Sequence, residues 1–145
     1  MKTRIVTRIL TIMLLSANVL PMMAQKNISK LVEELEKRND VEISMVTNRN
    51  PQTREITNKV KTIYVKDEAL FNKFVKAFEK DEEYTRTAIK DSKRKNGILV
   101  VDYNFKFEDE EGNYTYTLSS SSKTKGKFDI TIIFNPSKKD KKKDE

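Results

Sequence analysis

The chain has 145 residues, contains no cysteine and no histidine, has only three glycines, and carries a formal net charge of +7. This composition excludes disulfides, thiol chemistry and the commonest general base and metal ligand, and it disfavours a glycine-rich phosphate loop. Most of the excess charge, +5 of the +7, lies in residues 1–24 and 137–145. The remainder is close to neutral and has no clustered basic face, and we expect no nucleic-acid binding.

Residues 1–24 have the pattern of an export signal. A basic start precedes an apolar stretch from Ile9 to Leu20, and the small Ala24 suits a cleavage site before Gln25. The apolar stretch is shorter than the roughly 20 residues of a membrane-spanning helix. No cysteine follows it to accept a lipid, and no second long apolar segment occurs. We expect a periplasmic or secreted protein that is not a lipoprotein and whose mature chain has no transmembrane segment.

The mature chain has the length of one domain, which we place at residues 25–136. Residues 137–145 contain five lysines and three acids, too much charge to be buried, and we predict a disordered tail. Weak binding of this tail to a polyanion or an acidic envelope surface is one functional alternative.

Apolar residues recur at helical spacing from Ile28 to Leu35 and predict a short amphipathic helix that ends near Arg38. Asn27 or Ser29 is the expected N-cap of this helix, because both side chains can accept a hydrogen bond from a backbone amide of the first turn.

Alternation of apolar and polar residues predicts strands over 41–45 and 56–65, separated by a turn at 48–51. Asp67 is the predicted N-cap of a second helix. The apolar stripe of this helix is wide enough to cover a sheet and consists of Leu70, Phe71, Phe74, Val75 and Phe78. Segment 84–89 fits either a short strand or an extension of the helix. The basic cluster after it, Lys90, Lys93, Arg94 and Lys95, is predicted to be a solvated loop.

Residues 98–108, 114–118 and 128–134 alternate most clearly, and an acidic turn joins the first two segments. They predict a three-stranded antiparallel meander. The whole pattern indicates an α+β fold, in which the meander and the N-terminal strands form an antiparallel sheet with two helices packed on one face. The order of the elements also suggests a duplicated helix-plus-sheet unit.

With this leader, a short first helix, the strand VEISMV and the later meander, the chain resembles the small exported α+β proteins of unknown function that are common in Bacteroidetes bacteria. The resemblance covers most of the mature chain. It implies the fold class and a place in the cell envelope, and it carries no assigned catalytic residue.

The sheet face turned away from the helices is the candidate binding surface. Its predicted members carry short hydroxyls, an amide and mixed charges, and they are Asp102, Asn104, Lys106, Thr115, Thr117, Asp129 and Thr131. We expect Asp102 and Asp129 to share this face without an apolar cleft that would raise the pKa of either carboxyl.

These patterns favour a small exported, non-enzymatic binding module. Its partner would be a protein or a glycan of unknown identity bound on the exposed face, or a strand added to a sheet edge. We predict no cofactor and no metal site, and the oligomeric state stays open. The alternative activity is that of a carboxylate-dependent envelope hydrolase, which needs a concave site with two acids about 5 to 9 Å apart.

Overall fold

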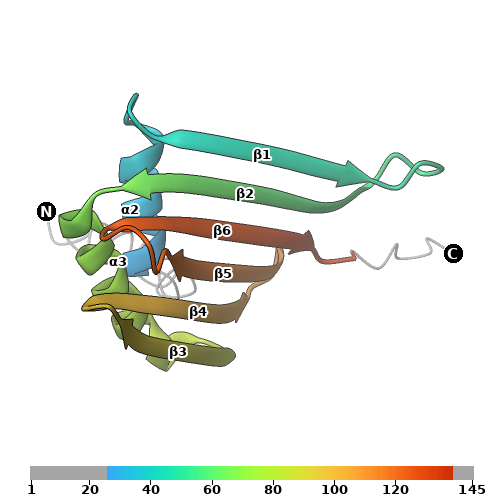
Figure 1. Ribbon diagram of the computed structural model, residues 1–145. Coiled ribbons are helices and arrows are strands. Elements are labelled where there is room, and N and C mark those ends of the chain that lie inside the picture. The colour runs from blue at the N-terminus through green and yellow to red at the C-terminus, as the bar shows by residue number, and fades with distance from the viewer. Residues whose placement is uncertain (1–25, 139–145) are drawn as a thin grey trace, which may run out of the picture.

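The computed structural model describes residues 26–138 (Figure 1). The predicted export signal, and the tail beyond residue 138, lie outside the described residues. In chain order the elements are α2 (Lys26–Glu36), β1 (Glu42–Arg49), β2 (Ile56–Lys66), α3 (Glu68–Asp81), the 3₁₀ turn η2 (Glu82–Tyr84), β3 (Thr87–Lys95), β4 (Ile98–Glu108), β5 (Gly112–Ser120) and β6 (Lys127–Pro136).

All six of these strands pair antiparallel in one sheet, in the order β1-β2-β6-β5-β4-β3. Both helices lie against one end of the same face of this sheet (Figure 1). The predicted α+β fold is confirmed. The meander formed by β4, β5 and β6 continues into the N-terminal hairpin because β6 pairs with β2. The two units of the suggested duplication differ in strand number, since α2 precedes two strands and α3 precedes four.

The core is a row of apolar side chains that crosses the sheet beneath the helices. Ile63, Ile130 and Leu118 lie opposite one another on neighbouring strands, and all three are fully buried. Helix α3 packs aromatic rings onto this layer: Phe78 meets Phe105 edge-on with ring centroids 5.0 Å apart. Full burial of a large apolar side chain stabilises a fold by about 1.5–3 kcal/mol, so this row and its aromatic cover hold the two layers together.

Asp67 is the N-cap of α3, as predicted. Its backbone is extended, and its Oδ1 accepts a hydrogen bond from the Leu70 amide at 3.0 Å. Each helix N-terminus leaves backbone amides without partners inside the helix, and a cap of this kind satisfies one of them.

The cap of α2 comes from a distant residue, and the predicted local caps are wrong. Asp81, the last residue of α3, is fully buried and accepts hydrogen bonds from the Ile28 amide at 2.8 Å and the Asn27 amide at 3.3 Å. The side chain of Asn27 donates a third bond to it at 2.7 Å. Ser29, the other predicted cap, instead pairs its hydroxyl with Tyr116 at 3.3 Å. The two helix ends are therefore joined through one carboxylate.

The prediction of a solvated loop at Lys90–Lys95 is also wrong, because these residues belong to the edge strand β3. A two-residue turn joins β3 to β4, and both of its residues, Asn96 and Gly97, have positive φ. Asn-Gly is the preferred sequence for such a hairpin turn, because both residues tolerate this backbone conformation. Segment 84–89 contains the last residue of η2 and the first residues of β3. Residues 48 and 49, which were predicted to lie in a turn, are the last two residues of β1.

Replacement of Asp81 should destabilise the fold more than replacement of the other helix-capping aspartate. We expect Asp81→Ala to lower the free energy of unfolding by about 3 kcal/mol, because buried amides lose a charged acceptor. Asp67→Ala removes a more exposed cap and should cost about 1 kcal/mol. Urea unfolding followed by circular dichroism measures both values. Equal losses in the two variants would contradict the role assigned to the buried cap.

Candidate binding surface on the open face of the sheet

The face of the sheet that carries no helix is called the open face here. The register places all seven predicted surface residues on it, in three adjacent rows across β4, β5 and β6. The first row holds Asp102, Ser119 and Asp129; the second holds Asn104, Thr117 and Thr131; the third holds Lys106 and Thr115, followed by Ile133. Strand alternation is the cause, since every second side chain of a strand points to the same face.

The structure adds residues from the N-terminal hairpin to these rows. Asp129 lies opposite Tyr64, which lies opposite Glu42, and Thr131 lies opposite Thr62 on β2. Sequence reasoning missed these members because it left the partner strand of β2 unassigned. Thr62 and Tyr64 alternate with the buried residues Ile63 and Val65, and this alternation indicates that they point to the open face. Only the pairing of β2 with β6 places them beside the meander.

The middle row is a line of short hydroxyls. It runs from Ser44 through Thr62, Thr131 and Thr117 to Asn104. Hydroxyls of Thr62 and Thr131 lie 3.3 Å apart, and the Asn104 amide donates to Thr117 at 3.4 Å. These contacts orient the side chains across the strands and leave their remaining hydrogen-bonding capacity facing outward.

A groove of about 490 Å³ lies at the end of the open face where β2 ends and β6 begins. It falls within the size range of small-molecule sites. Tyr64, 46% exposed, lines it together with neighbours from the first row and from the β5–β6 connection. The lining residues with polar side chains are Asp40, Glu42, Tyr64, Lys66, Ser119, Ser120, Ser121, Thr124, Lys127 and Asp129.

Asp129 is the unusual member of this groove. Its side chain is partly buried, and this burial, followed by the negative charge of Asp102, raises the pKa of the Asp129 carboxyl. Within residues 26–138 no hydrogen-bond donor and no cation engages its carboxylate. The prediction that nothing on this face raises the pKa of either aspartate is therefore wrong for Asp129.

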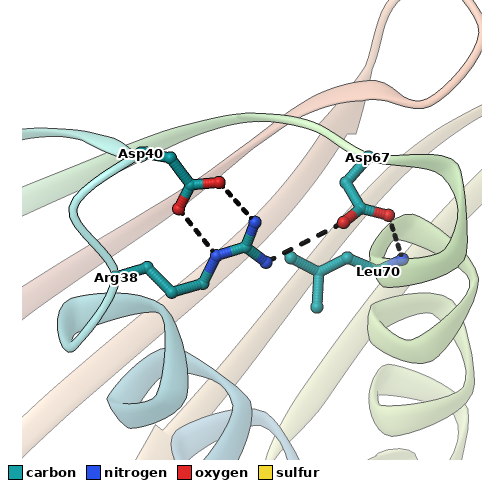
Figure 2. A network of polar contacts seen from close by, with 4 residues as sticks. All are labelled: Arg38, Asp40, Asp67 and Leu70. Carbon is teal, nitrogen blue, oxygen red and sulfur yellow. Dashed lines mark hydrogen bonds and ion pairs between the residues drawn. The ribbon is translucent and has the colours of Figure 1, made fainter.

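Asp40, which also lines the groove, differs from Asp129 because a cation is bound to its carboxylate. Figure 2 shows the Arg38 guanidinium between two carboxylates, with two hydrogen bonds to Asp40 at 2.6 and 2.8 Å and a longer ion pair of 3.8 Å to Asp67. The hydrogen bonds from Arg38 lower the pKa of Asp40. Because Asp67 also caps α3, this network connects the groove wall to the start of that helix.

The described residues contain no group of three or more acids suited to hold a metal ion. Asp102 and Asp129 are the partners of Ser119 on its two neighbouring strands, so two strand spacings, about 10 Å, separate their Cα atoms.

Within residues 26–138 no helix has the length and apolar character needed to cross a membrane.

The raised pKa of Asp129 predicts that its ionisation destabilises the fold. Its ordinary pKa is 3.8, and the folded state binds the proton more tightly than the unfolded chain does. The stability conferred by the protonated form is therefore lost as the pH rises through the folded-state pKa. We expect Asp129→Asn to be more stable than the wild type at pH 7, with the difference narrowing as the pH falls towards 3.8.

Urea unfolding across this pH range measures the effect. NMR titration of the Asp129 carboxyl should show a lower pKa in an Asp102→Asn variant, because the second cause of the shift is then removed. A less stable Asp129→Asn variant at pH 7 would contradict the assignment.

Comparison with known proteins identifies one family. A family model described as Domain of unknown function (DUF5024) matches residues 25–133. The matched range contains Tyr64, Asp129 and all the other groove residues. No curated protein and no solved structure matches the chain. Since the match covers well over half of the sequence, the protein belongs to the DUF5024 family, a family of domains of unknown function.

Proposed function

We propose that this protein is a small exported binding module without catalytic activity, and that its open face binds a saccharide in the groove beside Tyr64 and Asp129. The leader-like residues 1–24 support export. The single observation that carries the binding proposal is the partly buried carboxylate of Asp129, which has no donor within the described residues.

A carboxylate that is partly removed from water without a partner costs free energy in the unbound protein. A ligand that brings hydroxyl donors offsets this cost, since hydrogen bonds to a charged acceptor are worth about 1.5–3 kcal/mol. Asp129 is therefore prepared to accept hydrogen bonds from a hydroxyl-rich ligand. Functional sites often carry groups that lower the stability of the unbound protein.

Tyr64 supplies the second element of a saccharide site. Its ring is half exposed and lies directly opposite Asp129 in the register. A pyranose ring has an apolar C–H face and polar edges, so it can pack flat on an aromatic ring while its hydroxyls reach a neighbouring carboxylate. The adjacent hydroxyl row of Thr62, Thr131 and Thr117 offers further contacts to a longer chain.

The chemistry of the open face favours a saccharide over a protein partner. Buried centres of protein interfaces are depleted of Asp, Glu, Lys and Ser and enriched in aromatic side chains, Met and Arg. The rows next to the groove instead carry hydroxyls, an amide and carboxylates. Such a surface matches a ligand whose own surface is covered with hydroxyl groups.

Binding to a panel of immobilised polysaccharides, followed by calorimetry with the oligosaccharide that binds best, tests this function. Asp129→Asn should weaken the affinity about 10- to 100-fold, because the charged acceptor is lost. Tyr64→Ala should weaken it about 10-fold through loss of the stacking surface. Thr87→Ala, also exposed on the open face but on the edge strand β3, is the matched control and should keep wild-type affinity.

Absence of saccharide binding across the panel, or equal loss in the Thr87→Ala control, would overturn the proposal. Capture of a protein whose binding depends on Tyr64 and Asp129 would identify the open face as a protein-binding surface instead.

A carboxylate-dependent hydrolase is the second candidate. The observation in its favour is that the groove contains two aspartates, Asp40 and Asp129, with pKa values shifted in opposite directions. Active sites that use one carboxyl as an acid and another as a base separate their pKa values in this way. This function predicts release of reducing ends from a bound polysaccharide, abolished in both Asp129→Asn and Asp40→Asn. Bound saccharide that stays intact through long incubation would exclude it.

A further inference from the structure

The two edges of the sheet differ in their protection against pairing with another strand. β3, at one edge, carries the basic side chains Lys90, Lys93, Arg94 and Lys95, and charges of this kind are a common device against edge-to-edge association. β1, at the other edge, has no charged residue between Glu42 and Arg49. Its outer backbone groups therefore form an unguarded template for a further strand.

Apolar side chains are exposed on both faces of this unguarded edge. Met45, on the helix-bearing face, is 68% exposed, and Val46, on the open face, is 50% exposed. Both lie in the middle of β1. A strand paired with β1 contacts both side chains, Met45 on one face of the sheet and Val46 on the other. An element packed on a single face of the sheet can contact only one of them.

We propose that β1 pairs antiparallel with β1 of a second copy of this chain, so that two sheets join into one. Charge complementarity identifies the occupant and its direction. β1 begins at Glu42 and ends at Arg49, and these two residues are the charges of the strand, one at each end. Antiparallel self-pairing brings the acidic end of each strand beside the basic end of the other, while parallel pairing would place like charges together.

A two-fold axis through the middle of β1 satisfies the geometry. An isologous dimer places the same patch of both copies in contact, as is usual for soluble homodimers. With the axis near residue 45, Met45 lies beside its counterpart, and Ser44 of each copy lies opposite Val46 of the other. The axis is perpendicular to the sheet, so the helices of both copies lie on one side and both open faces lie on the other.

The groove beneath this edge is continuous with the proposed interface. Met45 lines a second groove of about 450 Å³ beside α2, whose other lining residues include Val32, Ile132 and Phe134. The side chain of Met45 from the second copy reaches the outer rim of this groove. Pairing therefore reduces the exposure of apolar side chains beyond the strand itself. It also places two saccharide grooves on one surface, where a polymeric ligand can occupy both.

Analytical ultracentrifugation of the purified protein tests the pairing. The wild type should sediment as a dimer, and Val46→Lys should sediment as a folded monomer, because lysine guards the edge as it does on β3. Ile89→Lys is the matched control: Ile89 is 60% exposed on the opposite edge strand, and its replacement should leave the dimer intact. Circular dichroism verifies that each variant is folded.

Charge reversal tests the direction of the strands. In this register Glu42 lies one position from Arg49 of the other copy, so Glu42→Arg or Arg49→Glu alone brings like charges near each other at both ends of the interface. Because each exposed pair contributes little, we expect the dimer to weaken about three- to tenfold. The double variant restores opposite charges at both ends and should recover much of the affinity. Failure of the double variant to recover would overturn the antiparallel arrangement.

The absence of cysteine from the chain allows a direct geometric test. A single Met45→Cys substitution should form a disulfide-linked dimer under mild oxidation, since the two copies of residue 45 lie next to each other. Ile89→Cys should stay uncrosslinked. A wild type that remains monomeric at concentrations of hundreds of micromolar, or equal crosslinking at both edges, would overturn the proposal.

Discussion

The buried carboxylate of Asp81 is the contact on which the helical layer depends. It ends α3 and accepts three hydrogen bonds from the first residues of α2. A helix N-terminus carries partial positive charge and a C-terminus carries partial negative charge, so the carboxylate is disfavoured by its own helix and stabilised by the other. The position of α2 over the sheet is therefore coupled to α3, which is itself anchored to the sheet by its phenylalanines.

This anchoring divides the sheet into two chemically different faces. The helices bury the apolar row that contains Ile63, Ile130 and Leu118. On each of these strands, the residues directly before and after a buried residue must point to the open face, because successive side chains alternate between the faces. Asp129 lies between two buried residues, Phe128 and Ile130, so its carboxyl points to the open face, where its neighbours across the strands are Tyr64 and Ser119. The core thus determines which face the carboxyl points to, and partial burial on that face, together with the charge of Asp102, raises the pKa of Asp129.

The charge network around Arg38 links this face back to the helices. Arg38 follows α2, Asp40 lines the groove, and Asp67 caps α3 (Figure 2). These side chains are exposed, where single ion pairs contribute little to stability. Their importance lies in orientation, because a bidentate pair fixes the direction of the carboxylate that forms one wall of the groove.

Local sequence patterns determined most of the elements of this protein. Period-two alternation identified the strands of the meander, and the phenylalanine stripe with Asp67 identified α3, because these signals depend only on neighbours along the chain. The face of the seven surface residues followed from the same alternation. The Asn96-Gly97 pair is a further hairpin signal in the sequence, but the prediction of a loop at Lys90–Lys95 did not use it, and β3 was identified as a strand only by the structure.

Only the tertiary structure decided the contacts between segments far apart in the chain. The pairing of β2 with β6 brings Tyr64 beside Asp129, and the packing of α3 against α2 brings Asp81 to the Ile28 amide across 53 positions of sequence. No periodicity encodes such partners, since an antiparallel strand or a buried acceptor is chosen by the packing of the whole core. The residue types of the groove were therefore in the sequence, while their assembly into a site came from the fold.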